Sequence, residues 1–220
     1  MQKKVLENSF KAAYLEFEKE PMDINYKNLS VGYVSRLRVK KIIEELEDLH
    51  GKRVLDVGCE AGYISLRLME CGAKVVAFDV CLPALKKFKK KLEKINRDIN
   101  PFIGIVQKIP LKDECMDYVV CSEVIEHAPY LDLSISEMSR VLKKGGKLIM
   151  TFPNEPLRKK FYPLARLLGI NTNVEKDVTL FSYTLDNVIT KCKQFFEIRK
   201  IYSIPKILPF TYFVICSKEK

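Results

Sequence analysis

The sequence predicts an α/β fold of the doubly wound kind, in which β-strands alternate with helices along the chain. Arg53–Val57 is an apolar, β-branched run of strand length. From Tyr63 the apolar residues recur with helical spacing, until Cys71 and Gly72 end the segment. A second β-rich run, Lys74–Phe78, follows directly. This alternation of strands and helices is typical of an α/β fold.

The turn between the first strand and its helix is suited to a nucleotide-like ligand. Gly58 and Gly62 enclose three residues. Glycine lets a ligand approach the main chain, and N–H groups at a helix start point outward toward negative charge. Asp79 ends the second strand, 17 residues after Gly62, where a doubly wound fold holds ribose hydroxyls. The dinucleotide fingerprint G-x-G-x-x-G is absent, because Glu60 stands at the middle glycine and Asp56 precedes the turn.

This combination resembles the first motif of the class I S-adenosylmethionine-dependent methyltransferases, (D/E)-x-G-x-G-x-G. Further segments resemble that family in the same order along the chain. They are Ile109–Leu111 with Met116–His127, Arg140–Leu148, and Thr151–Asn154, the last of which resembles the ubiquinone-biosynthesis-like branch. Ordered motifs at the family's spacing make the resemblance specific over roughly residues 53–154.

The resemblance implies a seven-stranded, mostly parallel sheet with one antiparallel strand and helices on both faces. Besides the first two strands, we expect strands at Phe102–Val106, Met116–Cys121, Lys147–Phe152, Phe195–Tyr202 and Phe210–Ser217. We expect helices at Lys4–Glu20, Ser35–Leu49, Ala84–Arg97, Tyr130–Leu142 and Thr184–Cys192. Lys143–Gly146 should end a helix and form a turn.

The length of 220 residues fits a single methyltransferase domain, 1–220. By the resemblance, residues 1–50 form N-terminal lid helices, 51–154 the cofactor-binding core, and 155–220 an acceptor-side cap and C-terminal hairpin. In the lid, the side chains that either pack or reach the cofactor or acceptor are Tyr14, Tyr26, Tyr33 and Arg36. The cap begins with a basic, amphipathic stretch, 155–168, which covers the acceptor or touches a membrane surface. Pro163 is expected to interrupt its helix.

Composition narrows the class of protein. The chain carries 38 basic and 28 acidic residues, a net charge of +10, which favours an anionic partner. No signal peptide, transmembrane run or repeat is evident, and the seven cysteines form no C-x-x-C pair. We therefore expect reduced thiols in a cytoplasmic protein. With two histidines and no paired cysteines, no metal site is expected.

The resemblance implies S-adenosylmethionine as the cofactor. The expected cofactor-binding residues are Asp56, Gly58, Cys59, Gly62, Asp79, Val80, Gln107, Lys108, Cys121 and Ser122. Asp79 would hold the ribose, Val80 would lie against the adenine, and the Cys121 carbonyl would accept from the cofactor's amino group. The family commonly has an aspartate for the adenine amino group where this chain has Ile105, and Gln107 is the nearest replacement.

Methyl transfer from a sulfonium is an in-line displacement, and a general base is needed only when the acceptor loses a proton. His127 is the first candidate base, and Glu123 and Glu126 are weaker ones. A structural role for His127 remains the alternative. The acceptor is expected to be a small or lipid-like molecule, and an anionic one suits the net charge.

Two other functions remain open, a methyltransferase acting on RNA or protein and a non-catalytic S-adenosylmethionine-binding protein. The helix Ala84–Arg97 carries seven Lys or Arg residues. It is either a basic face for nucleic acid, acidic lipid or an anionic substrate, or a solvated outer helix. The sequence does not predict the oligomeric state.

Overall fold

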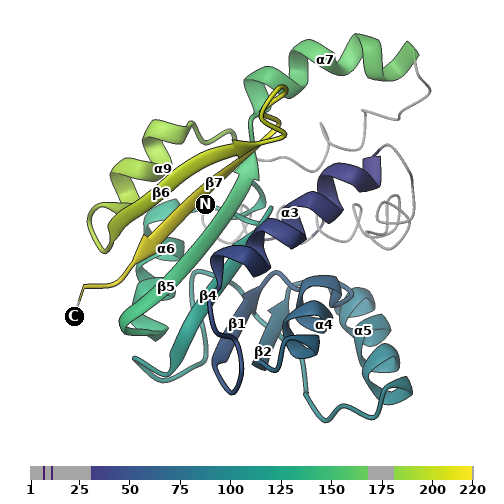
Figure 1. Cartoon of the computed structure of the whole chain (residues 1–220), viewed down its shortest axis with the longest axis vertical. Helices are drawn as coiled ribbons and strands as arrows, with labels where there is room; N and C mark the ends of the chain where they lie inside the picture. Colours follow the sequence, from purple (N-terminus) through teal and green to yellow (C-terminus); the bar gives the residue numbers. More distant parts are fainter. Residues whose placement is uncertain (1–6, 8–10, 12–30, 168–180, 220) are drawn as a thin grey trace.

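The computed structural model describes residues 7, 11, 31–167 and 181–219, and within them a seven-stranded sheet with the strand order β3-β2-β1-β4-β5-β7-β6 (Figure 1). The strands are β1 (Arg53–Val57), β2 (Lys74–Asp79), β3 (Phe102–Ile103), β4 (Met116–Ser122), β5 (Leu142–Pro153), β6 (Glu197–Ile204) and β7 (Thr211–Ser217). β1 to β5 pair in parallel, whereas β7 runs antiparallel to β5 and β6. The predicted mixed sheet is confirmed.

Helices cover both faces of this sheet (Figure 1). They are α3 (Val31–Glu45), α4 (Tyr63–Glu70), α5 (Leu82–Lys94), α6 (Leu131–Val141), α7 (Glu155–Leu167) and α9 (Leu185–Cys192), with a 3-10 turn at Ile125–His127. One hydrophobic cluster joins the sheet to α3, α4 and α5, and a second joins it to α6 and α9. None of the described helices is both long enough and apolar enough to cross a membrane.

β1 lies at the centre of the parallel sheet, which explains its apolar sequence. Leu55 pairs with Val76 of β2 on one side and with Val119 of β4 on the other. Val54 and Leu55 are fully buried, on opposite faces of the sheet. Burying such a side chain stabilises the fold by about 1.5–3 kcal/mol. A strand covered on both faces therefore reads as a continuous apolar run.

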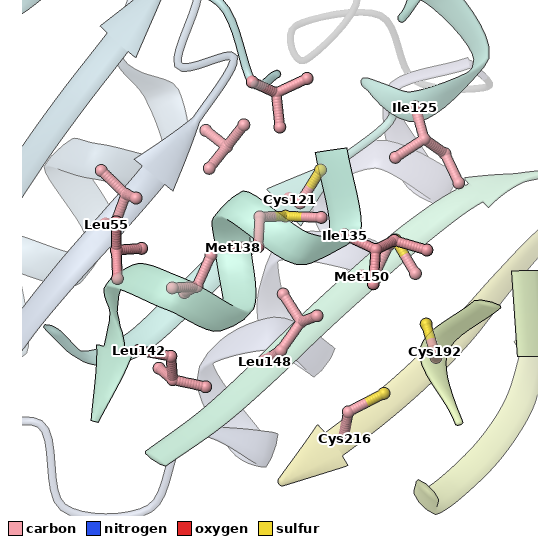
Figure 2. Packing of buried hydrophobic residues seen from close by; sticks show 14 of the residues in the cluster. Leu55, Cys121, Ile125, Ile135, Met138, Leu142, Leu148, Met150, Cys192 and Cys216 are labelled. Atoms are coloured by element: carbon pink, nitrogen blue, oxygen red, sulfur yellow. The ribbon is translucent and has the colours of Figure 1, made fainter. Parts of the chain in front are cut away.

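The cluster under α6 and α9 is rich in sulfur (Figure 2). It contains Cys121, Cys192 and Cys216 together with methionines from α6 and β5. All seven cysteines are free, as expected from the sequence. Burial raises the pKa of the Cys121 thiol, and a hydrogen bond with Cys192 together with burial raises that of Cys216. These thiols stay protonated and act as packing groups.

Several helix boundaries differ from the sequence predictions; α5, for example, spans Leu82–Lys94 and not Ala84–Arg97, and the differences in α3 and α7 have identifiable reasons. α3 begins at Val31 and ends at Glu45, not Ser35–Leu49, yet Leu46 and Leu49 remain buried in the core beyond the helix end. Apolar spacing cannot distinguish a last helical turn from a loop that packs equally well. α7 continues through Pro163, which was expected to interrupt it. The predicted helix Lys4–Glu20 lies outside the described residues except for positions 7 and 11.

Two strands also differ from prediction. β3 is only two residues long, because the chain turns at Ile105, whose carbonyl accepts from the N–H of Lys108. β5 begins at Leu142, where a turn was expected. Gly145 adopts φ +73° and donates its N–H to the Lys218 carbonyl at 2.9 Å. The glycine pair therefore forms an irregularity inside the strand, and the C-terminal segment completes its pairing.

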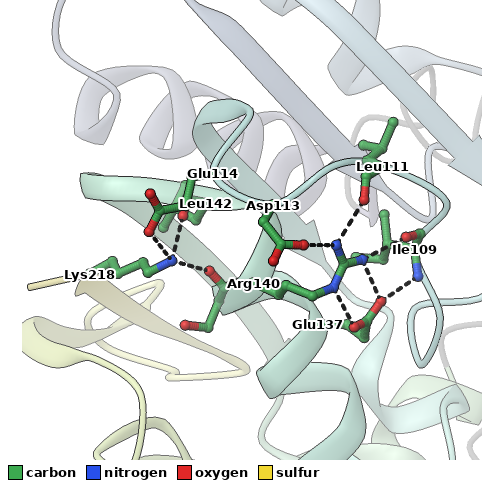
Figure 3. Close-up of polar contacts among 9 residues, drawn as sticks. Ile109, Leu111, Asp113, Glu114, Glu137, Arg140, Leu142 and Lys218 are labelled. Carbon is green, nitrogen blue, oxygen red and sulfur yellow. Dashed lines mark hydrogen bonds and ion pairs between the residues drawn. The ribbon is translucent and has the colours of Figure 1, made fainter.

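The loop between β3 and β4 is held by Arg140 of α6 (Figure 3). Its guanidinium donates to the carbonyls of Ile109 and Leu111 at 2.7 and 2.8 Å, and to Glu137 and Asp113 at 2.7 and 2.6 Å. The carboxylate of Glu137 accepts the N–H of Ile109 at 2.8 Å. Because these contacts clamp the main chain on the C-terminal side of Gln107, they position the loop expected to face the adenine.

Candidate cofactor and acceptor site

The glycine turn after β1 packs too closely against its neighbours to accept side chains. Gly58 and Gly62 have φ of +69° and +80°. A Cβ at Gly58 would lie 2.4 Å from Val124, and one at Gly62 would lie 2.1 Å from the ring of Phe88. The N–H groups of Gly58 and Cys59 both donate to the Phe78 carbonyl at 3.0 Å. The turn is thus tied to the end of β2.

Asp79 joins the ends of β1 and β2. Its carboxylate accepts the N–H of Glu60 at 2.8 Å and the N–H of Cys81 at 2.7 Å, and its side chain is almost fully buried. Glu60, which stands at the middle glycine of the motif, has φ +47°, the left-handed conformation that glycine prefers. The substitution therefore keeps the backbone shape of a glycine turn, and the hydrogen bond to Asp79 stabilises it.

Asp56 lies at the base of the turn and is buried. The Ser65 hydroxyl of α4 donates to its carboxylate at 2.5 Å. Burial raises the pKa of Asp56 to about 7, the hydrogen bond from Ser65 opposes this, and the charge of Asp79 adds to it. A carboxyl with this pKa changes its protonation near neutral pH and responds to a charged ligand nearby.

The predicted adenine-side residues lie on two loops. Val80 follows β2 and is half-buried, while Lys108 is exposed. The Gln107 side-chain amide donates to the Pro129 carbonyl at 2.6 Å, which ties this loop to the segment before α6. Its other amide atom, the oxygen, is the group that could accept from an adenine amino group. Ile105, at the position of the missing aspartate, is half-buried.

β4 brings the next two predicted residues to the same edge of the sheet. Cys121 pairs with Val57 of β1 and Met150 of β5, and its side chain is fully buried in the core. Only its main chain can therefore face a ligand. Ser122 and Thr151 share a hydrogen bond at 3.0 Å between their hydroxyls. Ser122 is thus linked to the end of β5.

Glu123 is the centre of a charged cluster that joins three elements. Its carboxylate accepts from Thr151 of β5 at 3.3 Å and from Arg158 of α7 at 3.2 Å. Arg38 of α3 lies 3.5 Å away, and the side chains of Arg38 and Glu123 are 5% and 11% exposed. Glu123 itself has φ +56°. Through Glu123 the cluster therefore connects α3, α7 and β5 next to the end of β4.

Glu126 and His127 lie on the 3-10 turn beside this cluster. Oε1 of Glu126 is 3.9 Å from Nε2 of His127, and Oε2 is buried without a hydrogen-bond partner. Burial raises the pKa of the Glu126 carboxyl, the neighbouring His127 opposes this, and the charge of Glu123 adds to it. Glu126 is therefore a buried acid whose charged form is disfavoured, next to a histidine whose side chain is 18% exposed.

The two arginines of the cluster were not predicted as site residues. Arg38 is buried on the same side of α3 as Val39 and Ile42. The feature of the sequence that could have identified it is a basic residue on an apolar helix face, because arginine is rarely buried unless it is paired. In the sequence Arg158 is marked only by its place in the basic stretch 155–168. Of the predicted lid residues, Tyr33 is exposed, and Tyr14 and Tyr26 lie outside the described residues. No group of three or more His, Cys, Asp or Glu side chains within the described ranges is arranged for a metal ion.

Comparison with known proteins matches residues 55–150 to a family described as a methyltransferase domain. An uncharacterized protein of Methanocaldococcus jannaschii is 33% identical over 140 residues, which cover 62% of this chain and 58% of that protein. The ubiquinone biosynthesis O-methyltransferase of Coxiella burnetii is 30% identical over 124 residues, which cover 56% of this chain and 53% of the enzyme. The chain therefore spans less than two thirds of the length of these relatives.

Solved structures share the fold. The magnesium protoporphyrin IX methyltransferase of Synechocystis PCC 6803, determined with bound SAH, superposes with a TM-score of 0.71. The two chains are 16% identical, and the match covers 96% of this chain and 100% of that one. At this identity the likeness is one of fold. It agrees with the strand order and the antiparallel β7 described above.

Proposed function

We propose that this chain is a class I methyltransferase that transfers the methyl group of S-adenosylmethionine to a small-molecule acceptor, because residues 55–150 match a family described as a methyltransferase domain and the relatives include an O-methyltransferase. The observation that carries the proposal is Asp79. Its carboxylate binds the main chain of the glycine turn, at the meeting point of the carboxyl ends of β1 and β2. That is where a doubly wound sheet holds a nucleotide-like ligand.

The residues present fit this cofactor. The two oxygens of Asp79 accept the N–H groups of Glu60 and Cys81, and a carboxylate offers about four lone-pair sites, so ribose hydroxyls can also donate to it. We assign the adenine to Val80 and the loop at Gln107 and Lys108. We assign the methionine end to the turn around Asp56, with Gly58, Cys59 and Gly62 admitting it closely. The Cys121 carbonyl and Ser122 complete this group, as the sequence predicted.

Arg38 extends this assignment. A buried guanidinium at the same edge of the sheet is suited to the cofactor's carboxylate, to which it can donate two hydrogen bonds. On this proposal the cofactor carboxylate shares Arg38 with Glu123, and α3 is drawn toward the site when the cofactor binds. The sequence predicts that residues 1–50 form a lid over the cofactor. We propose this role for α3, the helix that the structure describes within that range.

The bound cofactor supplies an electrophilic methyl group, and the chain aligns the acceptor and excludes water. The relatives that act as O-methyltransferases favour oxygen as the receiving atom, and an acceptor hydroxyl loses a proton. We assign to His127 the removal of this proton from the acceptor hydroxyl. Glu126 is buried beside His127. Glu123 already accepts from Thr151 and Arg158, so we assign it the positioning of α7 and α3.

The cofactor assignment is tested by calorimetric titration with S-adenosylmethionine, S-adenosylhomocysteine and NAD. We expect micromolar binding of the first two and none of NAD. Asp79→Ala should weaken binding by roughly tenfold or more, since hydrogen bonds to a charged group contribute about 1.5–3 kcal/mol each. Glu70→Ala is the matched control, because it removes an exposed acid of α4 that pairs with Arg67 on the same helix. Binding of NAD alone would overturn the assignment.

The acceptor class is tested by transfer of a labelled methyl group to hydroxylated aromatic compounds and their lipid-tailed analogues, beside total RNA and protein. Label in a small molecule supports the proposal. Label in RNA or protein would establish the alternative, and tight cofactor binding with no transfer would favour a non-catalytic role. His127→Gln should lower kcat with little change in cofactor Kd, whereas a structural histidine would lower stability instead.

A further inference from the structure

The net positive charge of the chain is concentrated on one helix. Residues 86–98 contain seven Lys and Arg and two Asp and Glu, which is +5 of the total of +10. These residues make up most of α5 and the segment after it. The proposed methyl-transfer site does not use them, except that Lys91 donates to the Ala61 carbonyl at 2.9 Å. The remaining lysines of α5 therefore have no assigned role.

Four lysines project from the outside of α5. The helix packs on the sheet through Ala84, Leu85, Phe88 and Leu92, each at most 2% exposed. The opposite side carries Lys86, Lys89, Lys90 and Lys94, all of them exposed. We call these four residues the α5 basic face. At 1.5 Å per residue they extend over about 12 Å.

Within the described residues the α5 basic face has no acidic partner, a feature that it shares with exposed lysines elsewhere, such as Lys159 and Lys160 of α7. None of its lysines forms an ion pair within the described part of the chain. On α3, α4 and α9 the exposed basic residues pair with acids, for example Arg67 with Glu70 at 2.5 Å and Lys191 with Asp132 at 2.8 Å.

Lysines without acidic partners destabilise the helix through mutual repulsion. Like charges four residues apart, such as Lys86 with Lys90 and Lys90 with Lys94, destabilise a helix by about 0.2–0.5 kcal/mol per pair. One acid, Glu93, is exposed on the helix among these lysines, and it forms no ion pair with them in the structure. The unpaired row thus indicates an external anion.

We propose that the α5 basic face binds the phosphate backbone of double-helical nucleic acid. One strand of a duplex carries a phosphate about every 3.4 Å along the axis, so a length of about 12 Å faces three or four phosphates. Four lysines in a row match this charge density. Lysines are point charges that contact phosphate without reading bases, so the binding is independent of sequence.

Two other anionic surfaces fit the face less well. Single-stranded nucleic acid is bound by exposed aromatic rings on which bases stack, and the aromatic residue of α5, Phe88, is fully buried. A membrane-surface helix inserts apolar side chains beside its basic ones. The apolar side of α5 is used in the core, and the exposed apolar side chains are at the two ends of the helix, Leu82 at 38% and the C-cap residue Ile95 at 52%.

The test is fluorescence anisotropy with a 20-base-pair RNA duplex, the same sequence as DNA duplex, and single-stranded RNA, between 50 and 200 mM salt. Vesicles of phosphatidylserine and phosphatidylcholine provide the lipid arm. Four phosphate contacts predict a slope of log K against log salt of about −3.6, so affinity for a duplex should fall about 100-fold over this range. The two duplexes together show whether the sugar matters.

The variant is Lys86→Gln, Lys90→Gln and Lys94→Gln in one chain. Its slope should fall to about −0.9, because each lost contact removes about 0.9. The matched control is Lys112→Gln, Lys144→Gln and Lys193→Gln, three exposed lysines on other elements that lower the net charge equally. The control should retain the slope of the natural chain.

Three results would overturn the proposal. The first is an equal loss of duplex affinity in both triple variants, which would show an effect of net charge alone. The second is no binding to either duplex at 50 mM salt. The third is stronger binding to vesicles than to duplexes. S-adenosylhomocysteine titration of the same samples reports separately on the fold and on the proposed methyltransferase site. Failure of one proposal is therefore distinguishable from failure of the other.

Discussion

At the scale of single residues, the site contains two carboxyl groups that are buried at a cost. Asp56 has a pKa of about 7, and Glu126 also has a raised pKa, both mainly because burial disfavours the charged form. A protein optimised only for stability would replace them by apolar residues. Their position at the carboxyl ends of β1 and β4 makes them candidates for ligand binding or proton transfer in the proposed site.

Asp56 makes stability depend on pH. Between its ordinary pKa of 3.8 and its native pKa of about 7, the native protein holds a proton that the unfolded chain releases. The resulting stability is present at low pH and is lost as the pH rises through 7. Each pKa unit corresponds to about 1.4 kcal/mol, so the free energy of unfolding should fall by up to about 4 kcal/mol from this group.

Asp56→Asn removes this titration, so the variant should lose less stability than the natural chain between pH 5 and pH 8. Urea unfolding at several pH values measures the difference. Ser65→Ala is the control, because it keeps the carboxyl and removes the hydrogen bond that lowers its pKa, and its pH dependence should be steeper. Parallel curves for Asp56→Asn and the natural chain would show that Asp56 does not titrate in this range.

At the scale of elements, the contact between α4 and α5 depends on a glycine. Gly62 and Gly51 both have positive φ, but a Cβ at Gly62 would meet the ring of Phe88 at 2.1 Å, whereas one at Gly51 meets nothing within 4 Å. Alanine costs about 1–2 kcal/mol in this conformation at either position. At Gly62 the clash with a fully buried ring adds overpacking, about 1–3 kcal/mol.

We therefore expect Gly62→Ala to lower the free energy of unfolding by more than Gly51→Ala does, with the difference near 2 kcal/mol. Urea unfolding of the two variants measures it. Gly62→Ala should also lose affinity for S-adenosylhomocysteine, and Gly51→Ala should not. Equal destabilisation would mean that Phe88 moves aside at little cost.

The clamp made by Arg140 is a second prediction at this scale. Lysine cannot reproduce the fork that contacts two carbonyls and two carboxylates. Arg140→Lys should destabilise the fold by about 2 kcal/mol and speed amide hydrogen exchange at Ile109. Arg67→Lys, which alters an exposed pair on α4, should change stability by less than about 0.5 kcal/mol. Unchanged exchange at Ile109 would contradict the clamp.

At the scale of the whole molecule, the strand order brings the separate parts of the site together. β1 lies between β2 and β4, so the turn after β1, the carboxylate after β2 and the acidic turn after β4 meet at one edge. α7 leaves the end of β5 at the same edge (Figure 1). A ligand at this edge would contact all four segments and would hold them in the native arrangement.

Cofactor binding should therefore stabilise the whole fold and not one loop. S-adenosylhomocysteine at 100 times its Kd should raise the free energy of unfolding by about 2.7 kcal/mol. Urea unfolding followed by circular dichroism and by tyrosine fluorescence measures this. Both probes should shift together. A shift in one probe alone would show that the site and the rest of the sheet unfold separately.

Local sequence patterns predict much of the fold and of the candidate cofactor site. The alternation of strands and helices, the glycine turn and the acid after the second strand follow from residues close together in the chain. Asp56, Gly58, Gly62 and Asp79 were predicted as one group, and the structure places them at neighbouring strand ends. Such features depend on side-chain spacing and on backbone freedom at glycine, which a sequence displays directly.

Only the tertiary structure decided the acceptor side. Arg38 and Arg158 are 120 positions apart and meet at Glu123, because the sheet order brings α3 and α7 to one edge. The burial of Glu126 and the packing of Leu46 outside its helix likewise depend on neighbours distant in sequence. Contacts of this kind are set by the order of the strands, and no local pattern of apolar or charged residues specifies that order.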